Sequence, residues 1–513
     1  MALTISPTVL LVSGAVVLYA LYTRIALYLR RRAFKKQHGC QPSYYRYNKD
    51  PFLGWDVLQE SITNAADHKL LAGMQARFLK LNTKTFHSRQ VNVPLITTCE
   101  PENVKTVLSI KFKDYSLGNR KAAFSPLLGD GIFNSDGEKW SNSRHLLRPN
   151  FARDQVADLE AFERHFKLMI KHIPSDGTTF DLQQLFFRFT LDSATEFLFN
   201  HSTNSLRVLG DDSGSAEAAF AKAFSSSMDD ILQHFRAGPL HFFRRGKKEG
   251  LEAVRVCHEY VERFVDEAIA WRRERDVGNV EEKEGDRYIF IRELVKQTTD
   301  RTALRNELIN VLLAGRDTTA SLLSNMFFEI ATKSGIWERL KEEVKFLEGR
   351  PPSYEELRNM KYIKWCLNES LRLHPVVPGN TRLAIRDTVL PLGGGPDQKA
   401  PLFVPAGTTV GYSPYTMHRR TDLYGPDAHL FRPERWDTLR PSWEYLPFNG
   451  GPRICLGQQY ALTEASFVTV RLAQMFDRLE SRDTNGGVWV EGLGLTLCSG
   501  NGVLVGLVKG EKA

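Results

Sequence analysis

The apolar and polar positions are distributed most unevenly over the first residues of the chain. No charged side chain occurs from Ala2 to Thr23, and a helix of about 20 apolar residues is long enough to cross a bilayer. A cleaved signal peptide has its basic residues before the apolar stretch, whereas here they follow it. This order predicts an uncleaved, single-pass anchor that leaves the body of the chain in the cytoplasm, with the endoplasmic reticulum as the expected membrane. The basic residues are Arg24, Arg30, Arg31, Arg32, Lys35 and Lys36.

Apolar residues at helical spacing recur among charges through the middle of the chain. They predict helices over Ala216–Phe235 and Leu251–Arg275 and a strongly apolar helix over Leu308–Ile330. The expected fold class is therefore mainly α, with small peripheral β-sheets. The strands of these sheets are expected near Leu402–Val404, Thr408–Tyr412 and Val503–Val508.

No internal repeat and no low-complexity linker divides the body of the chain. We therefore expect three parts in order along the sequence. A transmembrane anchor occupies residues 1–24, and a basic linker that enters the body occupies residues 25–55. A single catalytic domain occupies residues 56–513.

Composition narrows the possible partners. Of the 513 residues 42% are hydrophobic and 25% are charged, which is typical of a folded globular protein. The net charge of +8 is modest, and no dense Lys/Arg tract with interleaved aromatics occurs, which argues against a nucleic-acid partner. The cysteines form no CxxC pair, so neither a disulfide framework nor a zinc site is indicated. They are Cys40, Cys99, Cys257, Cys366, Cys455 and Cys498.

Cys455 differs from the other cysteines in its neighbours. Gly450 and Gly451 permit a tight turn and a close approach of the backbone to a flat ligand. The residues from Gln458 onward form a good helical run, which places Cys455 just before a helix N-terminus. Free N–H groups and the helix dipole at that position favour the thiolate over the thiol.

The segment from Phe448 to Gly457, Phe-Asn-Gly-Gly-Pro-Arg-Ile-Cys-Leu-Gly, resembles the haem-binding signature of the cytochromes P450 at every fixed position. The resemblance implies a cytochrome P450 fold, with Cys455 as the axial thiolate ligand of a haem b iron. A thiolate ligand favours cleavage of the O–O bond of oxygen. Arg453 is then expected to pair with a haem propionate and Phe448 to shield the sulfur from water. Gly457 is the last fixed position of this cofactor-binding signature.

The apolar helix carries a second motif, Ala314-Gly-Arg-Asp-Thr-Thr319. A glycine in mid-helix costs about 1 kcal/mol relative to alanine, which is understandable if something large must approach the backbone at Gly315. The motif resembles the distal helix of the same family. Oxygen activation consumes protons, and the resemblance implies that Asp317 and Thr318 relay them.

Two further sets of residues match the family. Glu369 and Arg372 lie three apart on one helical face, and the family's equivalent pair is buried with an arginine from a later loop, here Arg435. Their implied role is structural support of the cysteine loop. Trp436 departs from the phenylalanine that commonly ends this loop motif. The remaining implied propionate contacts are Trp140, Arg144 and Arg382.

Arg316 and the segment from Asn103 to Gly137 indicate a branch within the family. Ala-Gly-Arg-Asp-Thr is typical of fungal and plant enzymes that hydroxylate alkanes and fatty acids, and residues 103–137 are similar to those of the fungal enzymes. We therefore expect hydroxylation at or near the end of an aliphatic chain that arrives from the membrane. Fungal enzymes that oxidise polyketides, lipopeptides or other secondary metabolites can descend from the same branch of the family, and that alternative stays open.

The resemblance also implies electron donors and rival functions. The stretch after Cys455 is too short for a flavin domain, so an NADPH–cytochrome P450 reductase is the expected partner, with cytochrome b5 as a further candidate donor. Molecular oxygen and a lipophilic small molecule are the expected substrates. A haem-thiolate isomerase or peroxygenase would need no reductase, but the intact Asp317–Thr318 pair argues against it. The rival from another class is a membrane-anchored helical binding protein without redox chemistry.

Overall fold

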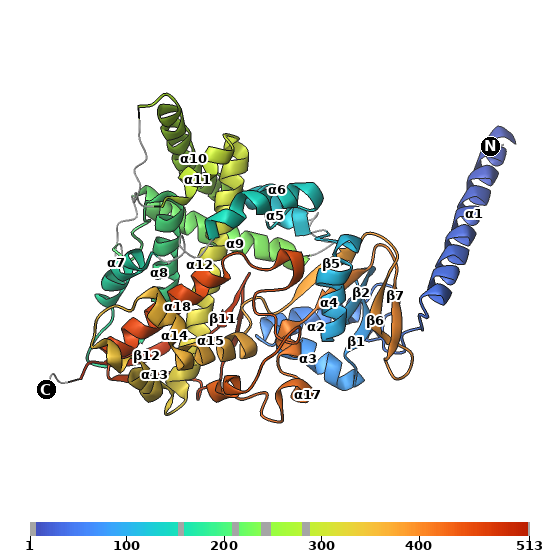
Figure 1. The fold of residues 1–513 in the computed structure, drawn as a ribbon. Coiled ribbons are helices and arrows are strands. Elements are labelled where there is room, and N and C mark those ends of the chain that lie inside the picture. The colour runs from blue at the N-terminus through green and yellow to red at the C-terminus, as the bar shows by residue number, and fades with distance from the viewer. Residues whose placement is uncertain are drawn as a thin grey trace.

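A computed structural model describes residues 7–118, 120–151, 158–207, 215–237, 248–279 and 288–510. Helices form most of the body, the strands β1, β2, β5, β6 and β7 lie at the side nearer α1, and one helix, α1, stands apart (Figure 1). The predicted mainly α class is confirmed. The helices before the central one are α2 (Trp55–Ala66), α3 (Leu70–Leu81), α4 (Pro101–Lys105), α5 (Arg120–Leu128), α6 (Gly137–Leu147), α7 (Leu159–Ile170), α8 (Leu182–Phe199), α9 (Ala216–Ala237), α10 (Lys248–Asp276) and α11 (Phe290–Gln297).

The central helix α12 (Arg301–Thr332) organises the core. It begins at Asp300, whose side chain accepts hydrogen bonds from the N–H groups of Thr302 and Ala303, as an N-cap residue does. Most of its side chains are buried on every face, and it packs against α8, α10, α15 and α18. The helices that follow it are α13 (Ile336–Val344), α14 (Tyr354–Asn359), α15 (Lys361–Leu373), α16 (Pro414–Met417), α17 (Thr421–Tyr424) and α18 (Gln458–Met475).

Within the residues that the structure describes, short strands form four small sheets. The largest has the order β1-β2-β8-β5-β3, in which only the β2–β8 pair is parallel. The others are β6–β7, β4-β12-β9 and β10–β11. The strands are β1 (Thr85–Gln90), β2 (Val93–Thr98), β3 (Tyr115–Ser116), β4 (Phe180–Asp181), β5 (Asn380–Ala384), β6 (Thr388–Gly394), β7 (Ala400–Val404), β8 (Thr409–Tyr412), β9 (Arg478–Ser481), β10 (Glu491–Leu493), β11 (Leu497–Ser499) and β12 (Leu504–Val508).

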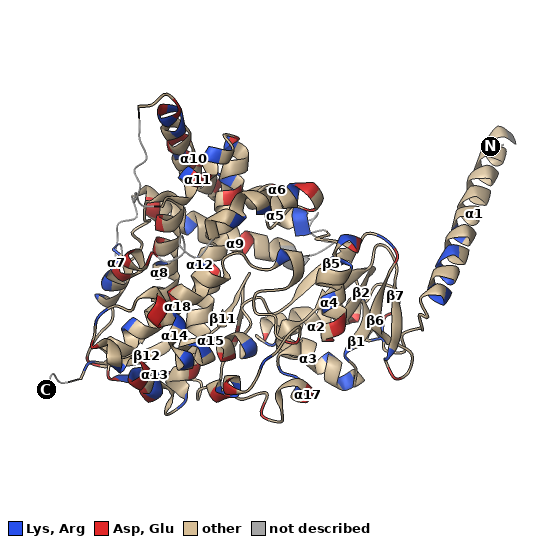
Figure 2. Ribbon diagram, in the orientation of Figure 1, with Lys and Arg blue, Asp and Glu red and all other residues tan. Residues whose placement is uncertain are grey.

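The first helix, α1 (Pro7–Gln37), projects away from the body. The span Thr8–Gln37 has a mean hydropathy of 1.8 over its most apolar part and is long enough to cross a membrane. Basic side chains gather in the half of α1 nearer the body (Figure 2). The helix continues through the basic stretch without a break, so the apolar and basic residues share one rigid element.

The end of α1 is fastened to the β6–β7 sheet. Arg31 donates to both carboxylate oxygens of Asp387, Nε to Oδ2 at 3.1 Å and Nη2 to Oδ1 at 3.0 Å. Asp387 also accepts the N–H of Ala406 at 2.8 Å, and the Lys35 ammonium lies 4.9 Å from the centre of the Phe403 ring. A forked guanidinium–carboxylate pair fixes direction as well as distance, so α1 leaves the body at a defined angle.

Candidate active site

Cys455 lies in a loop between a single 3-10 turn, Gly451–Arg453, and helix α18. The N–H of Cys455 donates to the carbonyl oxygen of Phe448 at 3.0 Å, and the N–H of Ile454 donates to that of Gly451 at 3.0 Å. These bonds close the loop on itself. The N–H of Gly457 hydrogen-bonds to the cysteine sulfur, as an N–H at the start of a helix can.

Two opposing effects act on the Cys455 thiol. Burial raises its pKa, whereas the Gly457 N–H at the helix start lowers it, as expected, and the Arg144 charge lowers it too. Desolvation by surrounding protein outweighs these favourable groups. The side chain nevertheless has accessible surface. A thiol that lines an enclosed space inside the molecule would combine the two properties, desolvation by surrounding protein and accessible surface.

The loop glycines permit the expected tight turn and, in addition, a close approach to neighbouring protein. Gly451 has φ +68, and a Cβ at this position would lie 2.0 Å from the carbonyl oxygen of Leu108. A Cβ on Gly450 would lie 2.7 Å from the Trp443 ring. The close approach is therefore to neighbouring protein, which presses the cysteine loop against the π-helical turn Thr106–Ile110.

Trp140, Arg144 and Arg453 gather beside the loop, as the resemblance implied for a shared cofactor site. The Arg453 guanidinium lies 4.5 Å from the centre of the Trp140 ring and donates to Ser135 O and Asp136 Oδ1, each at 2.8 Å. Arg144 Nη1 donates to Ile454 O at 3.1 Å. Helix α6 is thereby tied to the residue directly before Cys455.

A further arginine, Arg120 at the start of α5, joins this group. Burial lowers the pKa of Arg120 to about 10, and the charge of Arg382 lowers it further. Burial likewise lowers the pKa of Arg453 to about 10, with contributions from Arg382, Arg120 and Arg144. No motif marks Arg120 in the sequence, and only the fold brings it close enough to Arg382 of β5 for the two charges to interact.

This arginine cluster is short of negative charge. Among the described residues, Asp136 is the carboxylate that forms an ion pair with the cluster, through Arg453, and the Nε of Arg120 is buried without a hydrogen-bond partner. Like charges held together in a buried setting require a counter-anion. The two propionates of a haem would supply it, so the donor set fits that cofactor. Cys455 would be its axial ligand, and Arg120, Arg144, Arg382 and Arg453 would hold its acidic edge.

The middle of α12 is partly open where the rest of the helix is closed. Leu313–Arg316 and Thr318 retain accessible surface, whereas nearly all residues from Leu304 to Ile330 around them are buried. Since α12 packs against α18, the helix that follows Cys455, this open stretch is the expected distal wall of the site.

Asp317 and Thr318 do not hydrogen-bond to each other in the described structure. Thr318 Oγ1 donates to Ala314 O at 2.6 Å, within the helix. Asp317 Oδ1 lies 3.2 Å from Arg316 Nη1. Burial raises the pKa of the Asp317 carboxyl. The charge of Arg316 lowers this pKa, and the charge of Asp229 in α9 raises it. Asp317 therefore faces α9, while the Thr318 hydroxyl stays beside the open stretch.

Gly315 has a structural neighbour that the sequence did not indicate. A Cβ at Gly315 would lie 3.2 Å from the Cβ of Ala194 in α8. Thr190 Oγ1 also donates to Arg316 O at 2.8 Å. The glycine thus permits close packing of α8 on α12, in addition to any ligand on the other side.

The structure places Glu369, Arg372 and Arg435 in one buried network. Arg372 donates from Nε and Nη2 to the two oxygens of Glu369 at 2.9 and 2.7 Å, and both side chains are 0% exposed. Arg435 Nε lies 3.3 Å from Glu369 Oε1. Trp436 Nε1 donates to Glu369 Oε2 at 3.0 Å. The departure from phenylalanine at this position therefore adds a hydrogen-bond donor to the network.

The network reaches the cysteine loop through His418. Arg372 Nη1 donates to His418 O at 2.8 Å, and the N–H of Leu446 donates to His418 Nε2 at 2.9 Å. Tyr445 Oη donates to Asn368 O at 3.1 Å. Helix α15 is in this way connected to the residues just ahead of Phe448.

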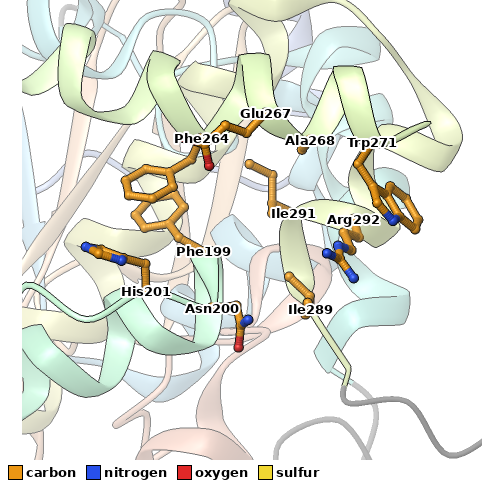
Figure 3. A pocket seen from close by; sticks show the side chains of 10 residues that line it. All are labelled: Phe199, Asn200, His201, Phe264, Glu267, Ala268, Trp271, Ile289, Ile291 and Arg292. Atoms are coloured by element: carbon orange, nitrogen blue, oxygen red, sulfur yellow. The ribbon is translucent and has the colours of Figure 1, made fainter. Parts of the chain in front are cut away.

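A pocket of about 250 Å³ lies elsewhere, between α8, α10 and α11 (Figure 3). The rings of Phe199 and Phe264 stack in its wall at 4.7 Å, and Arg292 lies against Trp271. None of its lining residues comes from α12 or the cysteine loop. It is therefore separate from the site described above.

A helical body with a loop cysteine ahead of a helix and an arginine cluster beside it is the arrangement expected of a haem-thiolate enzyme. The sequence profile of the cytochrome P450 family matches residues 65–487. The chain belongs to the cytochrome P450 family and is a cytochrome P450 monooxygenase. The rival assignment as a binding protein without redox chemistry is thereby replaced.

Several fungal proteins are similar over nearly the whole chain. Cytochrome P450 monooxygenase himC of Aspergillus japonicus is 50% identical over 496 residues, 95% of this chain and 88% of that protein. Cytochrome P450 monooxygenase fsdH of Fusarium heterosporum is 47% identical over 497 residues, covering 95% and 86%. Cytochrome P450 52A12 of Debaryomyces hansenii is 44% identical over 476 residues, covering 89% and 90%. Family membership implies a haem cofactor, oxygen, a redox partner and a lipophilic substrate.

Proposed function

We propose that this enzyme hydroxylates a fatty acid or n-alkane at or near the end of its chain. The observation that carries the proposal is the apolar character of the accessible residues near Thr318. Leu313 and Ala314 precede it in α12, and Leu495 at the tip of the β10–β11 hairpin packs against the same core cluster as Leu313. An aliphatic chain offers no hydrogen-bonding groups and needs walls of this kind.

Each residue of the site has a separate task in this proposal. Haem, when bound, supplies the oxygen-activating redox chemistry through its iron and the Cys455 sulfur. The Thr318 hydroxyl, beside the open stretch of α12, holds a proton for that reaction. Asp317 supplies the proton that Thr318 passes on, after a rotation of its side chain away from Arg316. The Glu369 network keeps the cysteine loop in place.

The same proposal includes location and electron supply. Helix α1 anchors the enzyme in the endoplasmic reticulum membrane, with the body on the cytoplasmic side where its basic residues lie. Electrons come from NADPH through a separate reductase, with cytochrome b5 as a further donor. The division into an anchor over residues 1–24, a basic segment over residues 25–55 and a catalytic domain over residues 56–513 belongs to this proposal.

Chain length is the variable that tests the substrate class. With full-length protein, reductase and NADPH, we expect terminal or near-terminal alcohols from fatty acids or n-alkanes. Each added methylene that is buried should raise kcat/KM about fourfold until the pocket is filled, because burial of one methylene contributes about 0.8 kcal/mol. Product positions are assigned by mass spectrometry. If the enzyme forms no alcohol from a fatty acid or n-alkane of any length but consumes NADPH with another lipophilic compound, this substrate class is excluded.

Loss of the Thr318 hydroxyl should separate electron consumption from product formation. In Thr318→Ala we expect NADPH consumption to continue while hydrogen peroxide replaces at least half of the alcohol, since a positioned proton donor contributes about 10²–10⁴-fold to a proton transfer. The matched control is Thr332→Ala, which removes the same type of hydroxyl–carbonyl bond (Thr332 Oγ1 to Phe328 O, 2.8 Å) at the far end of α12. Equal ratios of product to NADPH in both variants would remove Thr318 from this role.

The alternative from the sequence, the tailoring oxidation of a polyketide, lipopeptide or other secondary metabolite, stays open. The names of himC and fsdH, at 50% and 47% identity, state no substrate, and both proteins are more similar to this chain than 52A12 at 44%. The chain-length experiment distinguishes the two, since a bulky substrate would not follow the expected increment per methylene.

A further inference from the structure

The carboxylate of Glu491 in β10 connects the β10–β11 hairpin to a distant helix. Glu491 Oε2 accepts the N–H of Leu71 at 2.9 Å, and Oε1 accepts the N–H of Ala72 at 2.8 Å. These N–H groups lie in the first turn of α3, where no carbonyl of the same helix can accept them, and the residue before the helix, Lys69, supplies no side-chain cap. Glu491 therefore acts as the cap of α3, although Leu71 precedes it by 420 residues.

Several groups around Glu491 interact with its negative charge. The residue is 6% exposed, and burial raises the pKa of its carboxyl. The same two N–H groups lower this pKa, and so do the charges of Arg419 and His68. The ring Nδ1 of His68 also lies 2.9 Å from the carbonyl oxygen of Glu491. A glutamine could not replace the carboxylate here, because one of its two polar groups is a donor and would face an N–H.

The other end of the hairpin rests on α12. Thr496, beside the turn of the hairpin, has its Oγ1 2.9 Å from the Oγ of Ser321. Asn325 Nδ2 donates to Leu497 O at 2.8 Å. Ser321 lies one turn after Thr318 on the same face of the helix. The hairpin tip therefore contacts α12 directly beside its open stretch.

Apolar packing joins the hairpin to α3 between these two polar contacts. Leu71 of α3, Tyr415 of α16 and Leu497 of β11 form one buried cluster, and Leu493 of β10 packs against it. Protein interiors are close-packed, so a displacement of one of these elements moves the others. Helix α3, the hairpin and the middle of α12 thus form a continuous series of contacts, in which Glu491 is the charged link.

We propose that Glu491 determines which carbon of the substrate is hydroxylated, by holding the hairpin tip on α12. The inference rests on the aliphatic substrate proposed above. A methylene C–H bond is weaker than that of a terminal methyl group, so oxidation at the chain end requires walls that keep the methylenes away from the reacting centre. Leu495 and Thr496 of the tip form such a wall only while the hairpin cannot shift. Glu491 does not contact the substrate in this arrangement and is a positioning residue.

The positions of the product alcohols in Glu491→Gln test this inference. The full-length variant is assayed in lipid nanodiscs with reductase and NADPH, on the fatty acid or n-alkane that the wild type hydroxylates best. We expect product at the carbon that the wild type prefers to fall about fivefold relative to product at the neighbouring carbons, which is the shift in an equilibrium that loss of a helix cap typically produces. Mass spectrometry of the alcohols gives this ratio. The rate of NADPH consumption should change less than the ratio, because Glu491 contacts neither substrate nor cofactor.

The chain contains a second glutamate that caps a distant helix in the same way. Glu343 of α13 accepts the N–H groups of Tyr362 and Ile363, at the start of α15, at 2.7 and 2.9 Å. Glu343→Gln therefore removes the same kind of cap without a contact to the hairpin. It should lower the urea midpoint about as much as Glu491→Gln and leave the positions of the alcohols as in the wild type. If both variants change these positions equally, general loss of stability is the cause and the inference is overturned.

Hydrogen exchange measures the hold on the hairpin without turnover, which keeps the two proposals distinguishable. The N–H of Leu497 donates to Val376 O at 3.0 Å, and it should exchange about fivefold faster in Glu491→Gln than in the wild type or in Glu343→Gln. If the hairpin amides exchange at the wild-type rate in Glu491→Gln, or if that variant keeps the wild-type product positions, the inference is overturned. A wild type that forms no alcohol from aliphatic chains would contradict the proposed substrate, while the exchange result would be unaffected.

Discussion

Cys455→Ala should fold but lose both the spectroscopic signature and the activity of the enzyme. Cys455 is the cysteine that the loop bonds of Phe448 and Gly457 hold in place, and alanine offers no lone pair to a metal. The reduced protein treated with carbon monoxide should lack the red-shifted Soret band of a thiolate-ligated haem. We expect alcohol formation to fall below detection, because the other residues of the site cannot replace the axial ligand.

The control for this variant is another accessible thiol. Cys498 in β11 is partly buried, and burial raises its pKa to about 11, so Cys498→Ala should keep the Soret band and the activity. Circular dichroism of both variants checks that the helices are intact. A Cys455→Ala protein with an unchanged carbon monoxide spectrum would overturn the assignment of the ligand.

Glu369→Gln should be the most destabilising single-atom change in the body of the protein. It removes the carboxylate that faces Arg372 and Arg435, and both guanidinium groups are buried. Removing one partner of a buried ion pair leaves an uncompensated charge and costs about 3–5 kcal/mol. We expect a lower urea midpoint and loss of haem at concentrations that the wild type survives, because the network is bonded to the cysteine loop through His418.

The chain contains an exposed pair with the same spacing. Glu252 and Arg255 in α10 also lie three residues apart, with side chains 58% and 56% exposed. Glu252→Gln removes the same charge from the same helical geometry in water, where such pairs contribute little. Its urea midpoint and haem content should match those of the wild type. If the two variants are equally stable, the buried network does not support the fold in the way described here.

The helical part of the fold was predictable because its apolar periodicity is local. The helices predicted over Ala216–Phe235 and Leu251–Arg275 are found as α9 and α10, and the apolar run from Leu308 lies in α12. The three late strands are found as β7, β8 and β12. What the sequence could not provide was the pairing of these strands, since β8 joins β2 and β5 from distant parts of the chain.

In the candidate site, single residues were likewise predictable only where they stand in a sequence motif. Trp140, Arg144 and Arg453 stand in motifs that a sequence displays, and the structure brings them together. Arg120 stands in no motif and joins them only because the fold brings it close to Arg382 of β5.

Burial adds an effect on the Cys455 pKa that the neighbours along the chain do not reveal. The helix start lowers this pKa as expected and Arg144 lowers it too, but desolvation depends on the whole surrounding structure and outweighs them. A sequence shows which charged groups are near a cysteine along the chain. It does not show how far the folded protein excludes water from that cysteine.

The unbroken course of α1 into the Arg31–Asp387 contact has a mechanical consequence. A flexible tether would let the body tumble freely relative to α1. Here α1 and the β6–β7 sheet turn together, because the Arg31–Asp387 pair joins them. With α1 in a bilayer, as proposed, a tilt of the helix is transmitted to the body, so the bilayer thickness that suits α1 sets the orientation of the body at the membrane surface.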